Sequence, residues 1–179
     1  LEAVLARNPS GFIPEISAVL IAYDASNDST SSVAQQIKET RQDLPITVIQ
    51  HQSNLGYGGN QKAGYSWMIE NELDLVVLLH GDGQYAPEYL PKMIEPILSL
   101  QADVVFGSRM LTRGLALKGG MPKYKFVGNK ILTFWQNQMA GSKLSEWHSG
   151  YRAYSIDSLK KIEFQNNSDY FDFDTEIIL

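Results

Sequence analysis

Residues 76–88, VVLLHGDGQYAPE, join four apolar residues directly to the polar series His80, Gly81, Asp82, Gly83 and Gln84. A short apolar run bounded by glycine predicts a buried β-strand, and the polar series follows the end of that strand. Alternate residues of an extended chain face the same way, so the histidine, aspartate and glutamine would share one side. Their side chains are suitable ligands for Mg²⁺ or Mn²⁺. The competing interpretation is a glycine-rich turn in which Asp82 caps the next helix.

The same alternation of short apolar runs and helical segments recurs along the chain. Strands are predicted at residues 16–23, 46–50, 73–79, 102–108 and 149–155. Helices are predicted after a cap at Ser29 or Thr30, and at residues 60–70, 87–98, 126–139 and 156–162. This order predicts an α/β fold with a mostly parallel central sheet flanked by helices. We expect a single domain, residues 1–179, with ligands at the carboxyl ends of its strands.

The amino-acid composition indicates a globular domain and excludes sites that depend on cysteine. The chain has 179 residues, 44% of them hydrophobic, which is enough for one domain with a core. It has no cysteine, which excludes disulfides and thiolate metal sites. No signal peptide and no apolar run of about 20 residues is present, so a cytoplasmic location is expected.

Charge is distributed unevenly. The formal net charge is −5, yet residues 104–145 contain neither Asp nor Glu. The basic residues of this segment are Arg109, Arg113, Lys118, Lys123, Lys125, Lys130 and Lys143. A segment of one sign in an acidic protein indicates an anionic ligand or surface, with a solvated basic face as the alternative. Nucleic acid is not expected as the partner, because no nucleic-acid-binding motif accompanies the segment.

A second polar cluster follows the predicted strand at residues 16–23. Asp24 is placed to accept hydrogen bonds from a nucleobase, and Ser26 or Asp28 to reach a ribose. A polar turn in which Asp28 caps a helix explains the same residues without a ligand.

A third cluster follows the predicted strand at residues 46–50. Asn54, Gly56, Gly58 and Asn60 precede or open a helix, whose first amides attract a phosphate or a nucleotide edge. The glycine order fits neither a dinucleotide fingerprint nor a P-loop, so the motif is informative only together with the other two clusters.

Residues 145–155, SEWHSGYRAYS, follow the basic segment. Glu146 or His148 could act as a general base. A partly buried, hydrogen-bonded histidine and a structural ion pair of Arg152 are the alternatives for this stretch.

Taken in order, these motifs resemble glycosyltransferase family 2, which has the GT-A fold, and most closely its dolichyl- and polyprenyl-phosphate sugar transferases. The resemblance extends from about residue 16 to near the end of the chain. It rests on YDASNDST (23–30), NLGYGGNQKAGY (54–65), HGDGQYAPE (80–88), VVFGSR (104–109), EWHSGYRAYS (146–155) and FDFDTEI (171–177).

The resemblance implies a role for each matching position. It places Asp24 at the nucleobase and residues 54–64 along the nucleotide. It places Arg109 near a phosphate and Arg152 in the nucleotide-binding part of the site. His80, Asp82 and Gln84 fall on the metal motif, where the family usually has Asp in place of His80. Glu146 falls where the family usually has an Asp base.

The family's first strand has no counterpart in these residues. We therefore expect a domain truncated at both ends.

The resemblance implies an inverting, metal-dependent transferase that takes a sugar from a UDP- or GDP-sugar. The acceptor would be a polyprenyl phosphate or a glycan, in glycan or cell-envelope biosynthesis. Glu146 would deprotonate a hydroxyl acceptor, whereas Arg109, Lys123 and Lys125 would hold a phosphate acceptor. Association with a membrane surface, at its cytoplasmic face, would suit a lipid acceptor. The alternatives are a sugar nucleotidyltransferase and a non-catalytic nucleotide-sugar-binding domain.

Overall fold

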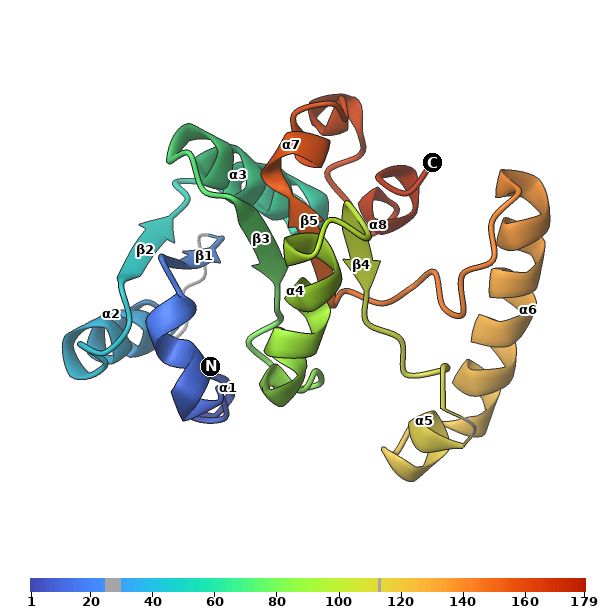
Figure 1. Ribbon diagram of the computed structural model, residues 1–179, viewed down its shortest axis with the longest axis horizontal. Helices are drawn as coiled ribbons and strands as arrows, with labels where there is room; N and C mark the ends of the chain where they lie inside the picture. Colours follow the sequence, from blue (N-terminus) through green and yellow to red (C-terminus); the bar gives the residue numbers. More distant parts are fainter. Residues whose placement is uncertain (25–29, 113) are drawn as a thin grey trace.

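The computed structural model describes residues 1–24, 30–112 and 114–179. Figure 1 shows two groups of strands covered by helices, with one long helix standing apart at the right of the view. The amino-terminal elements are α1 (Glu2–Ala6), η1 (Ser10–Glu15), β1 (Val19–Tyr23), α2 (Thr30–Thr40) and β2 (Ile46–Gln50). The middle of the chain forms α3 (Gly56–Glu70), β3 (Leu75–Leu78), η2 (Pro87–Tyr89), α4 (Leu90–Leu98) and β4 (Val104–Phe106). The last elements are α5 (Leu115–Lys118), α6 (Lys123–Ala140), β5 (Arg152–Ser155), α7 (Ile156–Leu159), η3 (Phe164–Asn166) and α8 (Phe173–Glu176).

The first two strands form the parallel pair that the sequence predicts. Val19 pairs with Ile46 and Tyr23 with Gln50, so the carboxyl ends of β1 and β2 lie side by side. Ile21, Ile37 and Ile46 belong to one buried cluster, which joins this pair to α2.

The other three strands form a sheet in the order β3-β5-β4. Strand β5 runs antiparallel to both neighbours: Arg152 pairs with Leu78 of β3 and with Phe106 of β4. The predicted α/β class with a parallel sheet is thus confirmed for β1 and β2, but the sheet is not parallel through β5. The reason lies in the long excursion between β4 and β5, which carries α5 and α6 and returns the chain in the opposite direction. Among the described residues no hydrogen-bonded strand pair joins the two sheets.

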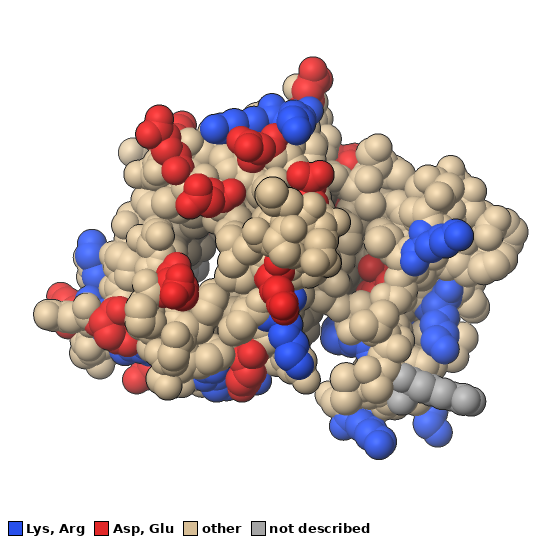
Figure 2. Space-filling view, in the orientation of Figure 1, with Lys and Arg blue, Asp and Glu red and all other residues tan. Residues whose placement is uncertain are grey.

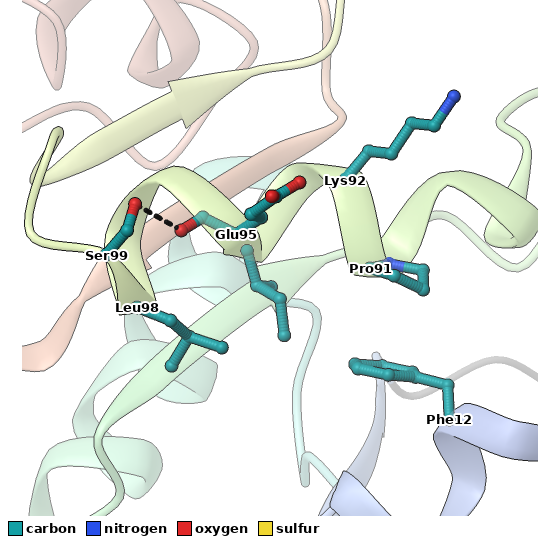
Figure 3. Close-up of a pocket in the computed structure, with 7 residues that line it drawn as sticks. Phe12, Pro91, Lys92, Glu95, Leu98 and Ser99 are labelled. Carbon is teal, nitrogen blue, oxygen red and sulfur yellow. Dashed lines mark hydrogen bonds between the residues drawn. The ribbon is translucent and has the colours of Figure 1, made fainter.

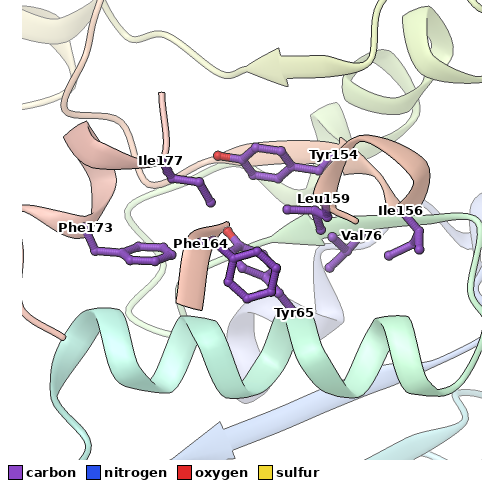
Figure 4. Close-up of a cluster of buried hydrophobic side chains, with 8 residues drawn as sticks. All are labelled: Tyr65, Val76, Tyr154, Ile156, Leu159, Phe164, Phe173 and Ile177. Atoms are coloured by element: carbon purple, nitrogen blue, oxygen red, sulfur yellow. The ribbon is translucent and has the colours of Figure 1, made fainter. Parts of the chain in front are cut away.

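Both faces of the three-stranded sheet are covered. Val76 and Tyr154 face the cluster drawn in Figure 4, where they meet Tyr65 of α3 and Phe173 of α8. The alternate positions, such as Val77 and Ala153, belong to a second cluster with residues of α4. The period of two in each strand thus places α3 on one face and α4 on the other.

Helix α3 begins at Gly56, earlier than predicted, because its glycines allow the chain near residue 169 to lie against it. A Cβ added to Gly58 would lie 2.4 Å from the carbonyl oxygen of Ser168 and 2.7 Å from Cβ of Phe173. Gly56 has φ +78°, a left-handed conformation that favours glycine. These glycines fix the carboxyl-terminal segment on the helix.

This packing predicts unequal effects for two alanine substitutions in one helix. Gly58→Ala should lower the free energy of unfolding by about 1–3 kcal/mol, because the new methyl group meets backbone that has little freedom to move. Gly64→Ala is the matched control, since a Cβ there meets nothing within 4 Å. It should raise stability by about 0.5–1 kcal/mol through helix propensity. Urea unfolding of both variants tests this, and equal effects would contradict the packing.

Candidate active site

The polar clusters predicted at the ends of the first two strands meet in the structure. The amide of Leu55 donates to Oδ1 of Asp24 at 3.1 Å, and the side-chain amide of Asn60 donates to the carbonyl of Ala22 at 3.3 Å. Asn54 accepts from the amide of Gly56 through its Oδ1 at 2.8 Å. The loop before α3 is therefore attached to the end of β1.

Ser26 and Asp28, predicted from the sequence as contacts of the ribose, lie outside the described residues. The amides of Gly58 and Gly59 donate to the carbonyl of Asp169, at 2.8 and 3.3 Å, rather than pointing to an open phosphate site. A contact between Gly58 and a nucleotide stays a prediction. In the structure, Gly58 lets the carboxyl-terminal segment pack closely against α3.

The end of β3 contacts the first turn of α3, which directly follows this loop. The hydroxyl of Tyr57 lies 3.2 Å from Nε2 of His80. Asp82 and Gln84 are exposed, and Oδ1 of Asp82 accepts from the amide of Gln84 at 3.0 Å. All three strand ends thus contribute to one cluster, in which Asp82 presents a carboxylate to solvent.

The divalent cation that the sequence predicts would need its donors from this cluster. Within residues 1–24, 30–112 and 114–179, no group of three or more His, Cys, Asp or Glu side chains could hold a metal ion. Mg²⁺, however, is usually bound by one or two carboxylates together with substrate phosphates and water. The exposed carboxylate of Asp82, beside Gln84 and His80, fits a cation that arrives with a diphosphate.

Arg109 and Glu146 form an ion pair beside this cluster. The buried carboxylate accepts from Nη2 of Arg109 at 2.5 Å, from its backbone amide at 2.8 Å and from Asn129 at 3.1 Å. Burial is the largest single influence and lowers the pKa of Arg109, but the hydrogen bond with Glu146 and the charge of that carboxylate together raise the pKa overall. The guanidinium also lies 5.8 Å from the ring centre of Tyr85, whose hydroxyl accepts from the amide of Gly150. Both oxygens of Glu146 are thus engaged, and its role as a base stays a prediction.

Arg152 lies beneath the site rather than at its surface. The side chain is fully buried, donates to the carbonyls of Ser149 and Trp147 at 2.8 and 3.3 Å, and lies 3.6 Å from Asp174. Its observed contacts are internal, as the ion-pair alternative expects, so a direct contact with a nucleotide stays a prediction.

Lys123 and Lys125 are exposed at the start of α6. Figure 2 shows basic side chains gathered at the right, over α5 and α6, while most acidic side chains lie over the rest of the visible face. No hydrogen bond or ion pair connects these two lysines with the strand-end cluster in the described part of the chain. The structure therefore separates a basic helical surface from the cluster of polar groups.

A groove between η1 and α4 is distinct from this cluster. Phe12, Pro91, Ile94 and Leu98 line it, with Lys92, Glu95 and Ser99 at its border (Figure 3). It contains none of the predicted site residues, so the polar cluster remains the candidate active site.

The sequence alone does not indicate Tyr85, Asn129 or Asp174 as members of the site, and it does not single out Tyr57 within residues 54–64. Asp174 stands within the FDFDTEI motif, and Tyr85 directly follows the polar series after β3, but neither position specifies a partner. Tyr57 and Asp174 are far apart in the chain, and only the fold brings them together.

Polar groups from the ends of three strands meet beside α3, and the ligands of open α/β sheets bind at the carboxyl ends of the strands. A family model described as "Glycosyl transferase family 2" matches residues 1–163. The chain therefore belongs to glycosyl transferase family 2 and has the GT-A fold of this family.

The names of three relatives state a function. The chain is 32% identical over 151 residues to the undecaprenyl-phosphate mannosyltransferase of Micrococcus luteus, covering 84% of this chain and 59% of that one. It is 28% identical over 171 residues to the UDP-N-acetylglucosamine--dolichyl-phosphate N-acetylglucosaminyltransferase of Methanococcus voltae, covering 90% and 67%. It is 27% identical over 145 residues to the polyprenol monophosphomannose synthase of Mycolicibacterium smegmatis, covering 81% and 53%. The chain thus spans 59% of the first of these relatives.

The burial of Glu146 predicts a large structural effect when its charge is removed. Glu146→Gln should lower the free energy of unfolding by about 1–3 kcal/mol, because Arg109 loses its partner. Asp43→Asn is the matched control: it breaks the pair of Asp43 with Arg41, whose atoms lie 2.7 Å apart but in contact with solvent. That exposed pair should contribute little. Thermal unfolding of both variants compares the two pairs, and similar small shifts would contradict a buried anchor.

Proposed function

We propose that this chain is the catalytic domain of an inverting sugar transferase that uses a UDP- or GDP-sugar and a polyprenyl-phosphate acceptor. The observation that carries the proposal is the joining of Asp24, the loop at residues 54–57 and the end of β3 in a family 2 domain. The named relatives support the choice of a lipid-linked phosphate as the acceptor.

In this mechanism the nucleoside lies against Asp24 and the Asn54 loop, and the diphosphate lies near Asp82 and Gln84. A divalent cation, Mg²⁺ or Mn²⁺, would neutralise the departing diphosphate when bound there. The acceptor oxygen attacks C1 of the sugar from the face opposite the diphosphate, which inverts the configuration. Arg109, anchored by Glu146, supplies a fixed positive charge for a phosphate group.

The engagement of Glu146 favours the phosphate acceptor over a glycan hydroxyl. A hydroxyl needs a base to take its proton, whereas a phosphate is already ionised near neutral pH. With both carboxylate oxygens of Glu146 accepting hydrogen bonds, a phosphate acceptor requires no rearrangement of this pair. For a hydroxyl acceptor, Glu146 would first have to release Arg109.

Helix α6 supports a membrane-surface location for the acceptor side of the domain. All 18 residues of this helix belong to the described part of the chain, and Thr133 is the only buried one among them. The large apolar side chains that it exposes are Tyr124, Val127, Ile131, Leu132, Phe134, Trp135 and Met139. Lysines are interspersed with them, and the surrounding segment has no acidic residue. This combination favours the interface of an anionic bilayer, where a polyprenyl phosphate resides. No helix in the described ranges has the length and apolar character needed to cross a membrane.

The two alternatives differ in their products. A sugar transferase releases free nucleoside diphosphate and forms a glycolipid, whereas a sugar nucleotidyltransferase releases pyrophosphate. Two incubations separate them. The first supplies UDP- or GDP-hexoses with a short polyprenyl phosphate and is analysed for free nucleoside diphosphate, and the second supplies UTP or GTP with hexose 1-phosphates and is analysed for pyrophosphate. A protein that binds the nucleotides but yields neither product would support the non-catalytic alternative.

The exposed carboxylate of Asp82 predicts metal-dependent nucleotide binding. Asp82→Ala should weaken Mn²⁺-dependent binding of GDP or UDP by at least about tenfold, measured by calorimetry with and without the metal. Asp74→Ala is the matched control, because Asp74 is exposed just before the amino end of the same strand. Unchanged metal-dependent binding in Asp82→Ala would exclude this residue as the ligand.

The apolar surface of α6 predicts binding to anionic vesicles. Ile131→Ser combined with Trp135→Ser should reduce sedimentation with vesicles of mixed phosphatidylcholine and phosphatidylglycerol by about tenfold or more, because each side chain contributes about 1.5–3 kcal/mol when buried in lipid. Leu98→Ser removes a comparably exposed side chain from α4 and should have little effect. Equal vesicle binding by all three proteins would contradict the membrane surface.

A further inference from the structure

A chain of polar contacts connects α8 with the end of β3. Oδ2 of Asp174 accepts from the hydroxyl of Tyr57 at 2.8 Å, and the same hydroxyl lies 3.2 Å from Nε2 of His80. The other oxygen of Asp174 accepts from Gln61 at 3.2 Å and lies 3.6 Å from Nη2 of Arg152. Three side chains, those of Tyr57, Gln61 and Arg152, therefore hold the carboxylate of Asp174.

The donors and acceptors fix the direction of each hydrogen bond. A carboxylate only accepts, so the single hydroxyl hydrogen of Tyr57 is donated to Asp174. The oxygen of Tyr57 can then only accept from His80, which requires the hydrogen of the imidazole on Nε2. With its ring hydrogen on Nε2, the imidazole carries its lone pair on Nδ1.

The imidazole ring is also held sterically. Tyr57 and Tyr85 meet it edge to face, with ring centres 5.7 and 5.3 Å away. A Cβ added to Gly150 would lie 2.6 Å from both Cε1 and Nε2 of His80. The ring thus has little room to turn, and within the described residues no hydrogen-bond partner of Nδ1 is found.

We propose that Tyr57 and Asp174 are positioning residues that hold His80 as its Nε2–H tautomer, so that Nδ1 is a ligand for the divalent cation of the nucleotide-sugar site. This inference rests on the proposed function and assigns this chain's own residues to it. Histidine ligands commonly donate their other ring N–H to a carboxylate or another fixed acceptor. Here the hydroxyl of Tyr57 lies between the imidazole and the carboxylate of Asp174, so that the contact between histidine and carboxylate is indirect.

The consequence is a different cation preference from that of a carboxylate at this position. A neutral nitrogen ligand next to the single carboxylate of Asp82 favours Mn²⁺ over Mg²⁺, whereas two carboxylates favour Mg²⁺. His80→Asp should therefore keep metal binding but shift the preference towards Mg²⁺.

The tautomer is tested first, without metal, nucleotide or acceptor. The chain has three histidines, so long-range ¹H–¹⁵N spectra of the full chain are simple, and His80→Gln identifies the His80 signals. We expect the Nε2–H tautomer in the wild type and a mixture of tautomers in Tyr57→Phe. An Nδ1–H tautomer in the wild type, or an unchanged spectrum in Tyr57→Phe, would overturn the proposal. Because no substrate is present, this result is independent of whether sugar transfer occurs.

Metal affinity is tested second, by Mn²⁺ electron paramagnetic resonance with GDP or UDP present. Tyr57→Phe and Asp174→Asn should each weaken Mn²⁺ binding about tenfold. Tyr89→Phe, at an exposed tyrosine, is the control and should leave it unchanged. If Tyr57→Phe lowers the melting temperature but leaves the Mn²⁺ affinity unaltered, these contacts are purely structural and the proposal is overturned. Absence of Mn²⁺ binding by the wild type would overturn it as well. Mn²⁺ binding without sugar transfer would refute the proposed function but not this inference.

Discussion

The buried guanidinium of Arg152 is the constraint on which the site depends. A charge without access to solvent is strongly destabilising unless it is paired and hydrogen-bonded, and removal of one partner from such a pair costs about 3–5 kcal/mol. Arg152 meets this requirement with the carbonyls of Ser149 and Trp147 and with Asp174. It opens β5, the central strand of its sheet, so these partners are fixed relative to β3 and β4. The buried charge therefore holds the loop after α6 and the carboxyl-terminal segment against the sheet.

The polar site follows from this arrangement. Arg152 holds Asp174 of α8, and the hydroxyl of Tyr57 donates a hydrogen bond to that carboxylate. The same hydroxyl contacts His80 at the end of β3. On the other side of the loop, Leu55 reaches Asp24 at the end of β1. The loop before α3 and the first turn of that helix thus join two sheets that share no hydrogen-bonded strand pair in the described ranges. A nucleotide placed along this loop would contact groups from both sheets.

The sequence predicts the strands and the candidate residues better than their connections. Residues 46–50 form β2 as predicted, because a short β-branched run bounded by polar residues has few alternatives. The antiparallel course of β5 is not evident, because RAYS carries no signal for strand direction. Helix α3 begins before its predicted start, since glycines that usually interrupt helices are here required by close packing. The partnership of Tyr57 with Asp174 depends on the whole fold, and no local pattern specifies it.

The most direct test of the central claim is a crystal structure of the chain with Mn²⁺ and GDP or UDP. We expect the nucleobase at Asp24, the ribose and diphosphate along residues 54–57, and the cation between the diphosphate and Asp82. Nucleotide bound in the groove lined by Phe12 and Leu98, or bound with Asp82 turned away from the phosphates, would contradict it.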